Sequence, residues 1–231
     1  MCAIFGIIGD YEEQLAKKAF ATLAHRGEDS CSITQKTNLF FAHHRLAITP
    51  STTLQPYSHQ HLLISFNGEI YNYKELAITL KDSFAFEHHD ELEVIAAAYL
   101  FWGVDFVCHL RGMFAIAILD KDTLHLFRDP SGKKPLFYLK TTKSFIFASE
   151  IKALIPFLQK KEMDNDAFLG YLSFLAPTPP FTFFKNIHKL AAGEHLLFEH
   201  EAIQTRLFFD ILDTPSSLIC DKDEAIFLLK Q

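Results

Sequence analysis

Apolar positions recur at strand and helix spacings along most of the chain. Residues 2–8 are apolar and β-branched and are followed by Gly9-Asp10, which predicts a buried strand at the N-terminus. Apolar side chains then recur at helical spacing over 15–23, and Gly27 stands where a helix C-cap is expected. Shorter strands are predicted at 31–35, 39–48 and 61–66, and Asn67-Gly68 has the chemistry of a tight turn that ends the last of them.

The second half of the chain predicts helices near 72–81 and 91–103, followed by strands. Met113–Leu119 is apolar on both alternating faces, so we expect a strand that is covered on both sides. This strand is predicted to form a hairpin with 124–127, and a second hairpin is predicted over 136–148. Beyond these we expect a helix near 164–172, strands around 187–200 and a helix from 222 to the end. Local hairpins and two helical blocks predict an α+β domain with antiparallel sheets in more than two layers.

Composition narrows the function classes. The chain has 231 residues, enough for one large domain or for one domain with part of another. Its net charge is −6 and only five of the 22 basic residues are Arg, which argues against a nucleic-acid partner. The longest uncharged apolar stretch, Val94–Val104, is shorter than the roughly 18 residues of a membrane span. The start has no basic n-region, so we expect a cytoplasmic protein with no membrane partner.

Cysteine and histidine spacing predicts no metal site. The four cysteines form no CxxC pair, and the twelve histidines form no HExxH motif. In a reducing compartment the cysteines are expected to be thiols.

Cys2 is the sharpest candidate for chemistry. Removal of Met1 leaves Cys2 with both a thiol and a free α-amino group. Such amines titrate at about 7.7–8.0, so the amine can act as the base for its own thiol. Asn67-Gly68 adds a side-chain amide and a backbone N–H, which are suitable donors for a developing oxyanion. Taken singly, an incidental cysteine and an ordinary turn remain the simpler explanations.

Charged residues complete a candidate site for an amino acid. Arg45 can pair with a carboxylate through two hydrogen bonds, and Glu69 or the acidic pair Asp90-Glu91 can hold an ammonium group. The alternative for the acidic pair is a favourable interaction with the dipole of the following helix.

An ordered set of motifs covers about residues 1–210. These are Met1-Cys2-Ala3-Ile4-Phe5-Gly6, His25-Arg26-Gly27-Glu28-Asp29, His44-Arg45-Leu46-Ala47-Ile48, Gln55-Pro56, Asn67-Gly68-Glu69-Ile70-Tyr71-Asn72-Tyr73, Leu110-Arg111-Gly112-Met113-Phe114-Ala115, Arg128-Asp129, Gly132-Lys133-Lys134-Pro135-Leu136, Ala148-Ser149-Glu150-Ile151-Lys152-Ala153-Leu154 and Ala192-Gly193-Glu194. Together they resemble the class II glutamine amidotransferase domain, and more closely the glutaminase half of glutamine-dependent asparagine synthetase. The run from Asn67 to Tyr73 favours the asparagine synthetase branch over the sugar-phosphate and phosphoribosyl-pyrophosphate amidotransferases.

This resemblance implies a fold and a mechanism. The fold is the four-layer αββα sandwich of the N-terminal nucleophile hydrolases. The Cys2 thiolate attacks the side-chain amide of L-glutamine, and Asn67 with the Gly68 N–H forms the oxyanion hole. The resemblance further implies substrate-binding roles for Arg45, Leu46, Ile48, Glu69 and an acid of the pair Asp90 and Glu91.

The chain departs from the family pattern at three places. Glu28 stands where the family usually has Pro, and the usual Ser-Asp-x-Glu aligns with Asp90-Glu91-Leu92-Glu93, so that either Glu91 or Asp90 replaces the ammonium-binding acid. No Ser-Gly-Gly-x-Asp-Ser pyrophosphate loop is present.

The departures limit the reaction expected of this chain. We expect a glutaminase domain over 1–210 and a linker with the truncated start of a synthetase domain over 211–231. ATP and Mg²⁺ are then expected only in the missing synthetase domain, with no cofactor here. A separate ATP-dependent synthetase chain and a homodimer remain open as partners. The alternative function is a catalytically silent remnant or interaction domain of the same fold.

Overall fold

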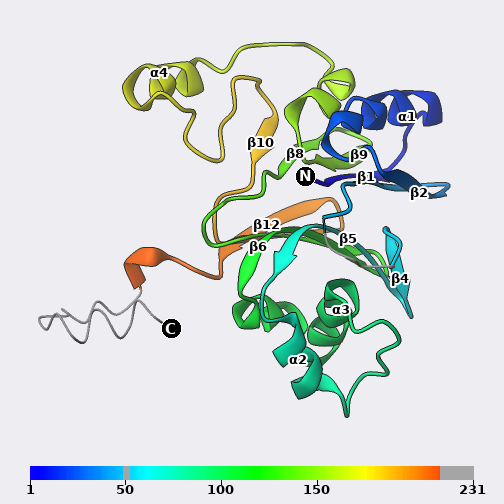
Figure 1. Cartoon of the computed structure of the whole chain (residues 1–231). Coiled ribbons are helices and arrows are strands. Elements are labelled where there is room, and N and C mark those ends of the chain that lie inside the picture. Colours follow the sequence, from blue (N-terminus) through cyan, green and yellow to red (C-terminus); the bar gives the residue numbers. More distant parts are fainter. Residues whose placement is uncertain (49–52, 214–231) are drawn as a thin grey trace, which may run out of the picture.

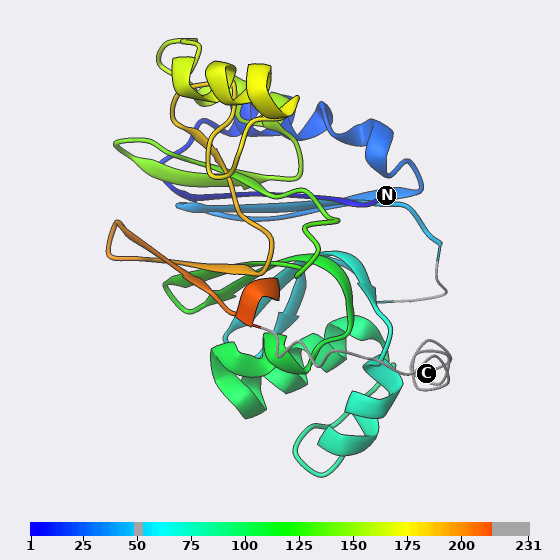
Figure 2. The same cartoon turned by 90° about the vertical axis from the view of Figure 1, so that its left-hand side faces the viewer.

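Two stacked antiparallel sheets form the centre of the molecule, and helices cover both outer faces (Figures 1 and 2). The computed structural model describes residues 1–48 and 53–213. The predicted helix from 222 and most of the predicted linker over 211–231 lie outside the described residues.

Each sheet has six strands. The first sheet has the order β10-β8-β9-β1-β3-β2, with β1 Ala3–Gly9, β2 Ser30–Lys36, β3 Leu39–Arg45, β8 Phe137–Lys140, β9 Ser144–Ala148 and β10 Ile187–Lys189. The second sheet has the order β12-β11-β7-β6-β5-β4, with β4 Tyr57–His59, β5 Leu62–Ile70, β6 Gly112–Asp120, β7 Thr123–Arg128, β11 Glu194–Glu199 and β12 Ala202–Leu207.

The helices divide between the two outer layers. Over the first sheet lie α1 Glu13–Ala21 and the short 3₁₀ turns η3 Ile151–Ala153 and η4 Ile155–Phe157, while α4 Asn165–Phe174 projects on the same side (Figure 1). Over the second sheet lie α2 Tyr73–Leu80, α3 Glu91–Trp102 and η2 Gly103–His109. The remaining 3₁₀ turns are η1 Ala24–Arg26 and η5 Ile211–Asp213.

Strand β1 lies in the interior because both of its faces are apolar. Phe5 and Ile7 pack against the helical layer, whereas Ile4 packs between the sheets. A Cβ at Gly6 would lie 2.3 Å from the ring of Phe147, so glycine permits the close approach of that ring. Phe147 in turn makes an edge-to-face contact with Phe41 at 5.2 Å. This packing holds the N-terminal strand rigidly between two layers.

The predicted turn at Asn67-Gly68 is wrong. Strand β5 continues through both residues to Ile70, and Asn67 and Gly68 pair with Ala115 and Phe114 of β6. Long-range pairing with β6 therefore overrides the local turn preference of the dipeptide. A Cβ on Gly68 would lie 2.1 Å from the carbonyl oxygen of Met113, so glycine is required for this approach.

Gly27 is not the C-cap of the predicted helix. Helix α1 ends at Ala21, and Gly27 follows the separate turn η1 with an extended φ of −159°. A Cβ at Gly27 would lie 2.6 Å from the carbonyl carbon of Arg45. The glycine therefore serves close packing against the end of β3 rather than a left-handed cap.

One helical segment of the described residues, Glu91–His109, is long and apolar enough to cross a membrane by length and composition. Its side chains from Leu92 to Tyr99 are buried against the second sheet, as expected for a core helix. The same burial positions the start of α3, which carries Glu91.

Candidate active site

A pocket between the two sheets opens at the start of β1. Eight of the nine site residues expected from sequence line it, and these eight come from four separated parts of the chain. These eight are Cys2, Arg45, Leu46, Ile48, Asn67, Gly68, Glu69 and Glu91. The ninth, Asp90, is not among the lining residues.

Cys2 immediately precedes β1 and is held from two sides. Its Sγ accepts a hydrogen bond from the Leu46 N–H at 3.4 Å and lies 3.7 Å from the Leu46 carbonyl oxygen. The Nε of Arg26 donates to the Cys2 carbonyl oxygen at 3.1 Å. Met1 lines the same pocket. The backbone of Leu46 therefore places the thiol, and the Arg26 guanidinium holds the backbone of Cys2.

Arg26 is itself anchored by Glu150. Its Nη1 donates to Glu150 Oε1 at 2.9 Å, and the same carboxylate contacts His25 at 2.9 Å and Lys152 at 3.1 Å. Burial opposes ionisation of Glu150, but hydrogen bonds from Arg26, Lys152 and His25 outweigh it and hold the pKa of Glu150 below its usual value. A carboxylate at the centre of three basic groups thus fixes Arg26 next to Cys2.

Asn67 is 1% exposed, and its Nδ2 has no hydrogen-bond partner among the described residues. A buried amide donor without a partner costs about 1–3 kcal/mol. Such a cost is typical of functional sites, where the partner is supplied by a ligand. Because Asn67 and Gly68 line the pocket of Cys2, the Asn67 Nδ2 group can donate a hydrogen bond to an oxygen of a molecule bound there.

The two acidic candidates have different surroundings. Asp90 is the N-cap of α3, and its side chain accepts hydrogen bonds from Leu92 N at 3.1 Å and Glu93 N at 3.2 Å. Glu91 lines the pocket and accepts a hydrogen bond from Ile70 N at 2.5 Å. Burial raises the pKa of Glu91 to about 7, so a cation beside it would favour the charged form.

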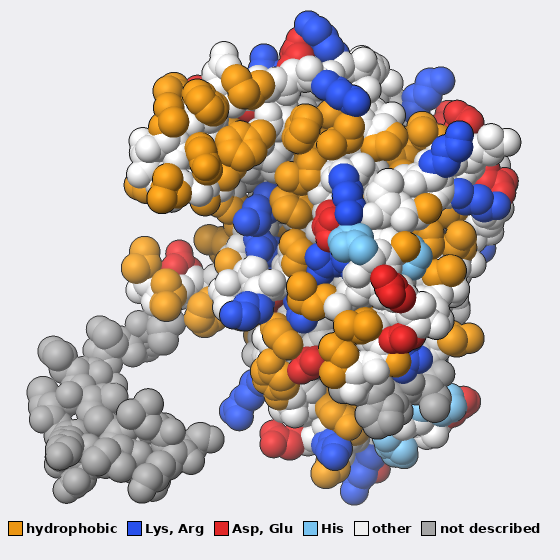
Figure 3. Space-filling model, turned by 45° about the horizontal axis from the view of Figure 1, so that its top comes forward, with side chains coloured by type: hydrophobic (Ala, Val, Ile, Leu, Met, Phe, Trp, Pro, Cys, Tyr) orange, Lys and Arg blue, Asp and Glu red, His pale blue; other side chains and the backbone are white. Residues whose placement is uncertain are grey.

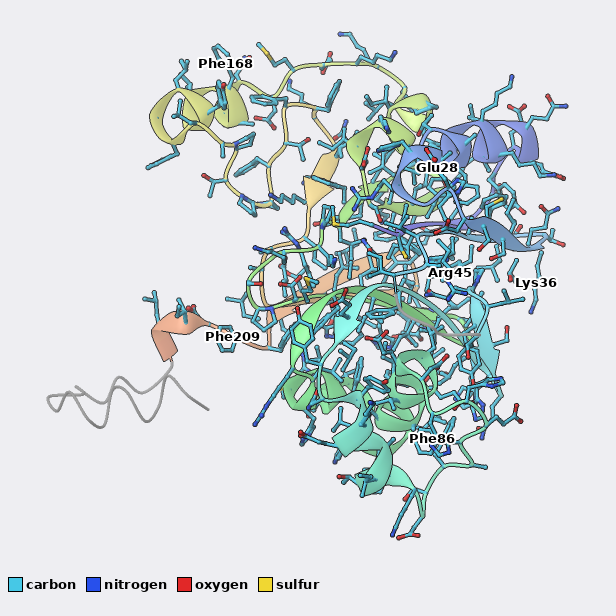
Figure 4. All side chains as sticks on the ribbon, in the orientation of Figure 1. Glu28, Lys36, Arg45, Phe86, Phe168 and Phe209 are labelled. Atoms are coloured by element: carbon cyan, nitrogen blue, oxygen red, sulfur yellow. The ribbon has the colours of Figure 1, made fainter. Side chains whose placement is uncertain are left out.

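Arg45 is the last residue of β3, and Figure 4 shows it between the two sheets. The segment that follows it is held by Asp29, whose carboxylate accepts a hydrogen bond from Ala47 N at 2.6 Å.

Glu28, the residue that departs from the family pattern, is exposed and is not among the residues that line the pocket (Figure 4). The Glu28 side chain therefore forms no part of the pocket wall.

Several pocket residues were not expected from sequence. His43 and Thr53 are buried in the wall, and neither His43 Nε2 nor Thr53 Oγ1 has a partner among the described residues. Lys134 also lines the pocket and is 6% exposed. Strand periodicity could have predicted His43 as a pocket residue, because positions 43 and 45 lie on the same face of β3 and Arg45 was already a candidate. Burial lowers the pKa of His43 to about 4, so its imidazole is neutral.

The family follows from a comparison of the whole chain. Residues 1–209 match the model of the glutamine amidotransferase domain. The chain belongs to this family. This membership confirms the resemblance and the glutamine amidotransferase class expected from the motifs.

Relatives of this glutamine amidotransferase domain are longer enzymes. Asparagine synthetase [glutamine-hydrolyzing] 3 of Bacillus subtilis is 32% identical over 91% of this chain and 37% of its own length. Asparagine synthetase B [glutamine-hydrolyzing] of Escherichia coli is 36% identical over 68% of this chain and 30% of its own length. The chain thus spans about a third of the length of these curated relatives.

Solved structures share the fold of this glutamine amidotransferase domain. The glutamine phosphoribosylpyrophosphate amidotransferase from B. subtilis aligns with a TM-score of 0.64 and 19% identity, over 90% of this chain and 49% of that one. The structure described as the allosteric regulatory enzyme of purine biosynthesis aligns with a TM-score of 0.68 and 20% identity, over the same shares of the two chains. The predicted α+β sandwich of antiparallel sheets is confirmed.

Proposed function

We propose that this chain hydrolyses the side-chain amide of L-glutamine to glutamate and ammonia at Cys2, as the ammonia-supplying half of a glutamine-hydrolysing asparagine synthetase. The observation that carries the proposal is the pocket in which the Cys2 thiol and the unpartnered Asn67 amide lie together. Arg45 and Glu91 add one cation and one acid to the same pocket, which matches the charges of an amino acid.

The first step follows from the groups around Cys2. Once Met1 is removed, the α-amine of Cys2 takes the thiol proton and the thiolate attacks the amide carbon of glutamine. Negative charge moves to the amide oxygen, which is stabilised by donors from Asn67 Nδ2 and the Gly68 N–H. The C–N bond then breaks, the α-ammonium returns its proton to the leaving nitrogen, and ammonia departs.

The second step releases glutamate. The acyl group remains on sulfur as a γ-glutamyl thioester. Water, deprotonated by the α-amine, attacks the thioester carbon with the same oxyanion donors in place. The C–S bond breaks, the sulfur recovers a proton and glutamate leaves. No cofactor enters either step, and ATP and Mg²⁺ belong to the synthetase reaction that consumes ammonia.

Recognition of glutamine uses both of its charged groups. Arg45 pairs with the α-carboxylate in the bidentate geometry that guanidinium groups favour. Glu91 receives the α-ammonium, and Asp90 supports it only indirectly, as the cap of α3. Backbone groups of Leu46 and Ile48, together with Glu69, frame the substrate. The reaction is that of a cytoplasmic biosynthetic enzyme.

Met1 lines the pocket, and the Arg26 Nη2 lies 4.0 Å from its sulfur. Its removal both frees the α-amine of Cys2 and enlarges the space beside the thiol. Mass spectrometry of the purified protein is expected to show a chain that begins at Cys2. A protein that retains Met1 and still hydrolyses glutamine contradicts the role of the α-amine.

Glutamine hydrolysis by the purified chain tests the proposal directly. Cys2→Ala is expected to abolish glutamate production, whereas the control Cys31→Ala, which removes an exposed thiol outside the pocket, keeps it. Full activity of Cys2→Ala overturns the mechanism. The rival function, a catalytically silent interaction domain, predicts no calorimetric binding of glutamine and no labelling of Cys2 by a reactive glutamine analogue.

A further inference from the structure

Strand β5 has an open edge beside the Cys2 pocket. Strand β4 covers only residues 62–64 of this edge, because its three residues pair with Leu62, Leu63 and Ile64. Residues 66–70 of β5 pair with β6 on one side and have no strand on the other side among the described residues. An antiparallel strand turns every second N–H group to a given edge. The N–H groups on this part of the edge therefore need acceptors other than a strand.

The Gly68 N–H lies on the open edge. Phe114, the residue opposite Gly68 in β6, directs its own backbone groups away from β5. Its carbonyl oxygen accepts a hydrogen bond from Asp129 N at 2.9 Å, and its N–H donates to Asp129 Oδ2 at 3.2 Å. Gly68 and Phe114 are thus a non-hydrogen-bonded pair, in which each residue turns its N–H away from the other strand. Phe66 and Ile70, two positions to either side, turn theirs to the same edge.

Side chains supply acceptors on both sides of Gly68. Phe66 N donates to Gln55 Oε1 at 2.6 Å, and Ile70 N donates to Glu91 Oε1 at 2.5 Å. The Gly68 N–H lies between these two fixed groups, on the edge beside the pocket that Gly68 lines. The two acceptors thus hold the strand on either side of a proposed oxyanion donor.

Gln55 occupies the place that a further residue of β4 would have. The register of β4 with β5 continues to Gln55 opposite Phe66, where a backbone carbonyl would accept the Phe66 N–H. The Gln55 carbonyl oxygen instead accepts a hydrogen bond from Ser32 Oγ of β2, and the side-chain Oε1 replaces it at Phe66. One residue therefore links the first sheet to the second, and all three residues line the pocket.

The direction of the Gly68 N–H depends on its neighbours in the strand, because glycine has no side chain through which it could be held. Phe66 precedes Asn67, the second proposed donor, and lies two residues before Gly68. Loss of the acceptor at Phe66 would leave an unpaired N–H and release β5 just before both donors. The contact from Gln55 is therefore placed to set the aim of the two donors together.

We propose that Gln55 is a positioning residue for glutamine hydrolysis, which holds β5 so that Asn67 Nδ2 and the Gly68 N–H point at the same oxyanion. This role rests on the proposed function. Gln55 bonds to Phe66 rather than to either donor, so it acts through the strand. Its effect belongs to the transition state, in which the amide oxygen of glutamine becomes negative, and not to substrate binding.

Gln55→Met tests the role, because it keeps the length of the side chain and removes the oxygen acceptor. The kcat for glutamine hydrolysis should fall by about 10- to 100-fold with little change in KM. Gln204→Met, at an exposed position of β12 outside the pocket, is the control and should keep kcat. Alkylation of Cys2 by iodoacetamide, which forms no oxyanion, should proceed at the wild-type rate in both variants.

Gln55→Glu is the matched rescue, because its carboxylate keeps an acceptor at the same distance from the backbone. Its kcat should exceed that of Gln55→Met. Acidic and basic side chains lie interspersed on the face shown in Figure 3, so one more carboxylate adds little to the long-range field at the pocket. Deuterium exchange of the Phe66 amide should be faster in Gln55→Met than in the wild type and Gln55→Glu, which reports the strand contact independently of activity.

Far-ultraviolet circular dichroism shows whether each variant is folded, and Gln55→Asn, which is shorter by one methylene, replaces Gln55→Met if that variant does not fold. A wild type without glutaminase activity overturns the proposed function, and this role with it. With an active wild type, three results overturn this role alone: an unchanged kcat in Gln55→Met, a Gln55→Glu protein no more active than Gln55→Met, or alkylation of Cys2 that slows in parallel with kcat.

Discussion

The Nε atom of Arg26 donates a hydrogen bond of 3.1 Å to the carbonyl oxygen of Cys2, while its Nη1 pairs with Glu150 at 2.9 Å. Glu150, in the segment after β9, thus anchors Arg26 of η1, and Arg26 holds the backbone of the nucleophile. Only a planar guanidinium can make both contacts from one side chain. Arg26 therefore acts as a positioning residue for Cys2.

The Arg26→Lys variant tests this role. A lysine cannot reach both acceptors in the same geometry, and a displaced thiol reacts more slowly, so kcat for glutamine hydrolysis should fall by about 10- to 100-fold with little change in KM. Arg206→Lys, which alters an arginine paired with Asp105 outside the pocket, is the control and should keep kcat. Equal kcat values in the two variants would show that Arg26 does not position Cys2.

Removal of the Asn67 amide should act on the transition state. Asn67→Ala takes away the side-chain donor for the oxyanion, and kcat should fall by about 100- to 1,000-fold while KM changes little. The folded protein should lose little stability from this change, because Asn67 Nδ2 has no partner among the described residues. Steady-state kinetics and thermal unfolding measure the two effects. A variant with normal kcat would remove Asn67 from the oxyanion hole.

Glu91 should make glutamine binding depend on pH. Its pKa is raised to about 7, so the carboxylate becomes protonated as the pH falls below 7 and attracts the substrate ammonium less. KM for glutamine is expected to rise as the pH falls from 8 to about 6. In Glu91→Gln, KM should be high at every pH and should lack this dependence. A parallel pH dependence of KM in both proteins would assign the titration to another group.

The same shift has a consequence for stability. A carboxyl group with a pKa raised on folding binds its proton more tightly in the native state, so its stabilising contribution is lost as the pH rises from about 4.5 to about 7. Glu91→Gln should therefore be more stable than the wild type at pH 8, by roughly 1–3 kcal/mol. Urea unfolding at pH 8 measures this difference, and a less stable variant contradicts it.

A buried histidine pair should make the domain sensitive to acid. His125 Nδ1 and His195 Nε2 lie 3.0 Å apart between β7 and β11, and His195 stacks on Phe127 at 4.4 Å. Burial, together with the neighbouring His125 and Arg206, lowers the pKa of His195 to about 3, and burial also lowers the pKa of His125.

In the unfolded chain both histidines become protonated near pH 6.5, whereas in the folded chain they stay neutral to a lower pH. The free energy of unfolding should therefore fall as the pH drops below 6.5. The loss through His195 alone should be about 2 kcal/mol between pH 6.5 and 5. In urea unfolding between pH 6.5 and 5, the free energy of unfolding should change less with pH in His195→Gln than in the wild type. Unchanged slopes would exclude the pair as the source of acid sensitivity.

Local patterns were sufficient for most elements of the fold. The N-terminal strand, the two hairpins over 113–127 and 136–148 and the helices near 72–81 and 91–103 agree with the structure within a few residues. These elements have alternating or helical apolar periodicity and short connections, so their signals lie within the segment itself. The motifs and the acidic pair likewise contained eight candidate residues that line the pocket, including the nucleophile Cys2.

Tertiary structure decided what depends on contacts between distant segments. Asn67 and Gly68 lie in a strand because β6 pairs with them, and no local preference of an Asn-Gly dipeptide encodes that partner. Of the adjacent acids, Asp90 caps α3 and Glu91 faces the pocket, a distinction set by how α3 docks on the second sheet.

The sequence by itself thus determined the elements, the family and the chemical groups, because these depend on residue identity and short-range spacing. Only the packing of the two sheets decided which groups lie together, and in particular that the Cys2 thiol and the unpaired Asn67 Nδ2 line the same pocket. The physical reason is that the two residues are 65 positions apart, and their approach results from the burial of both sheet faces rather than from any signal at either position.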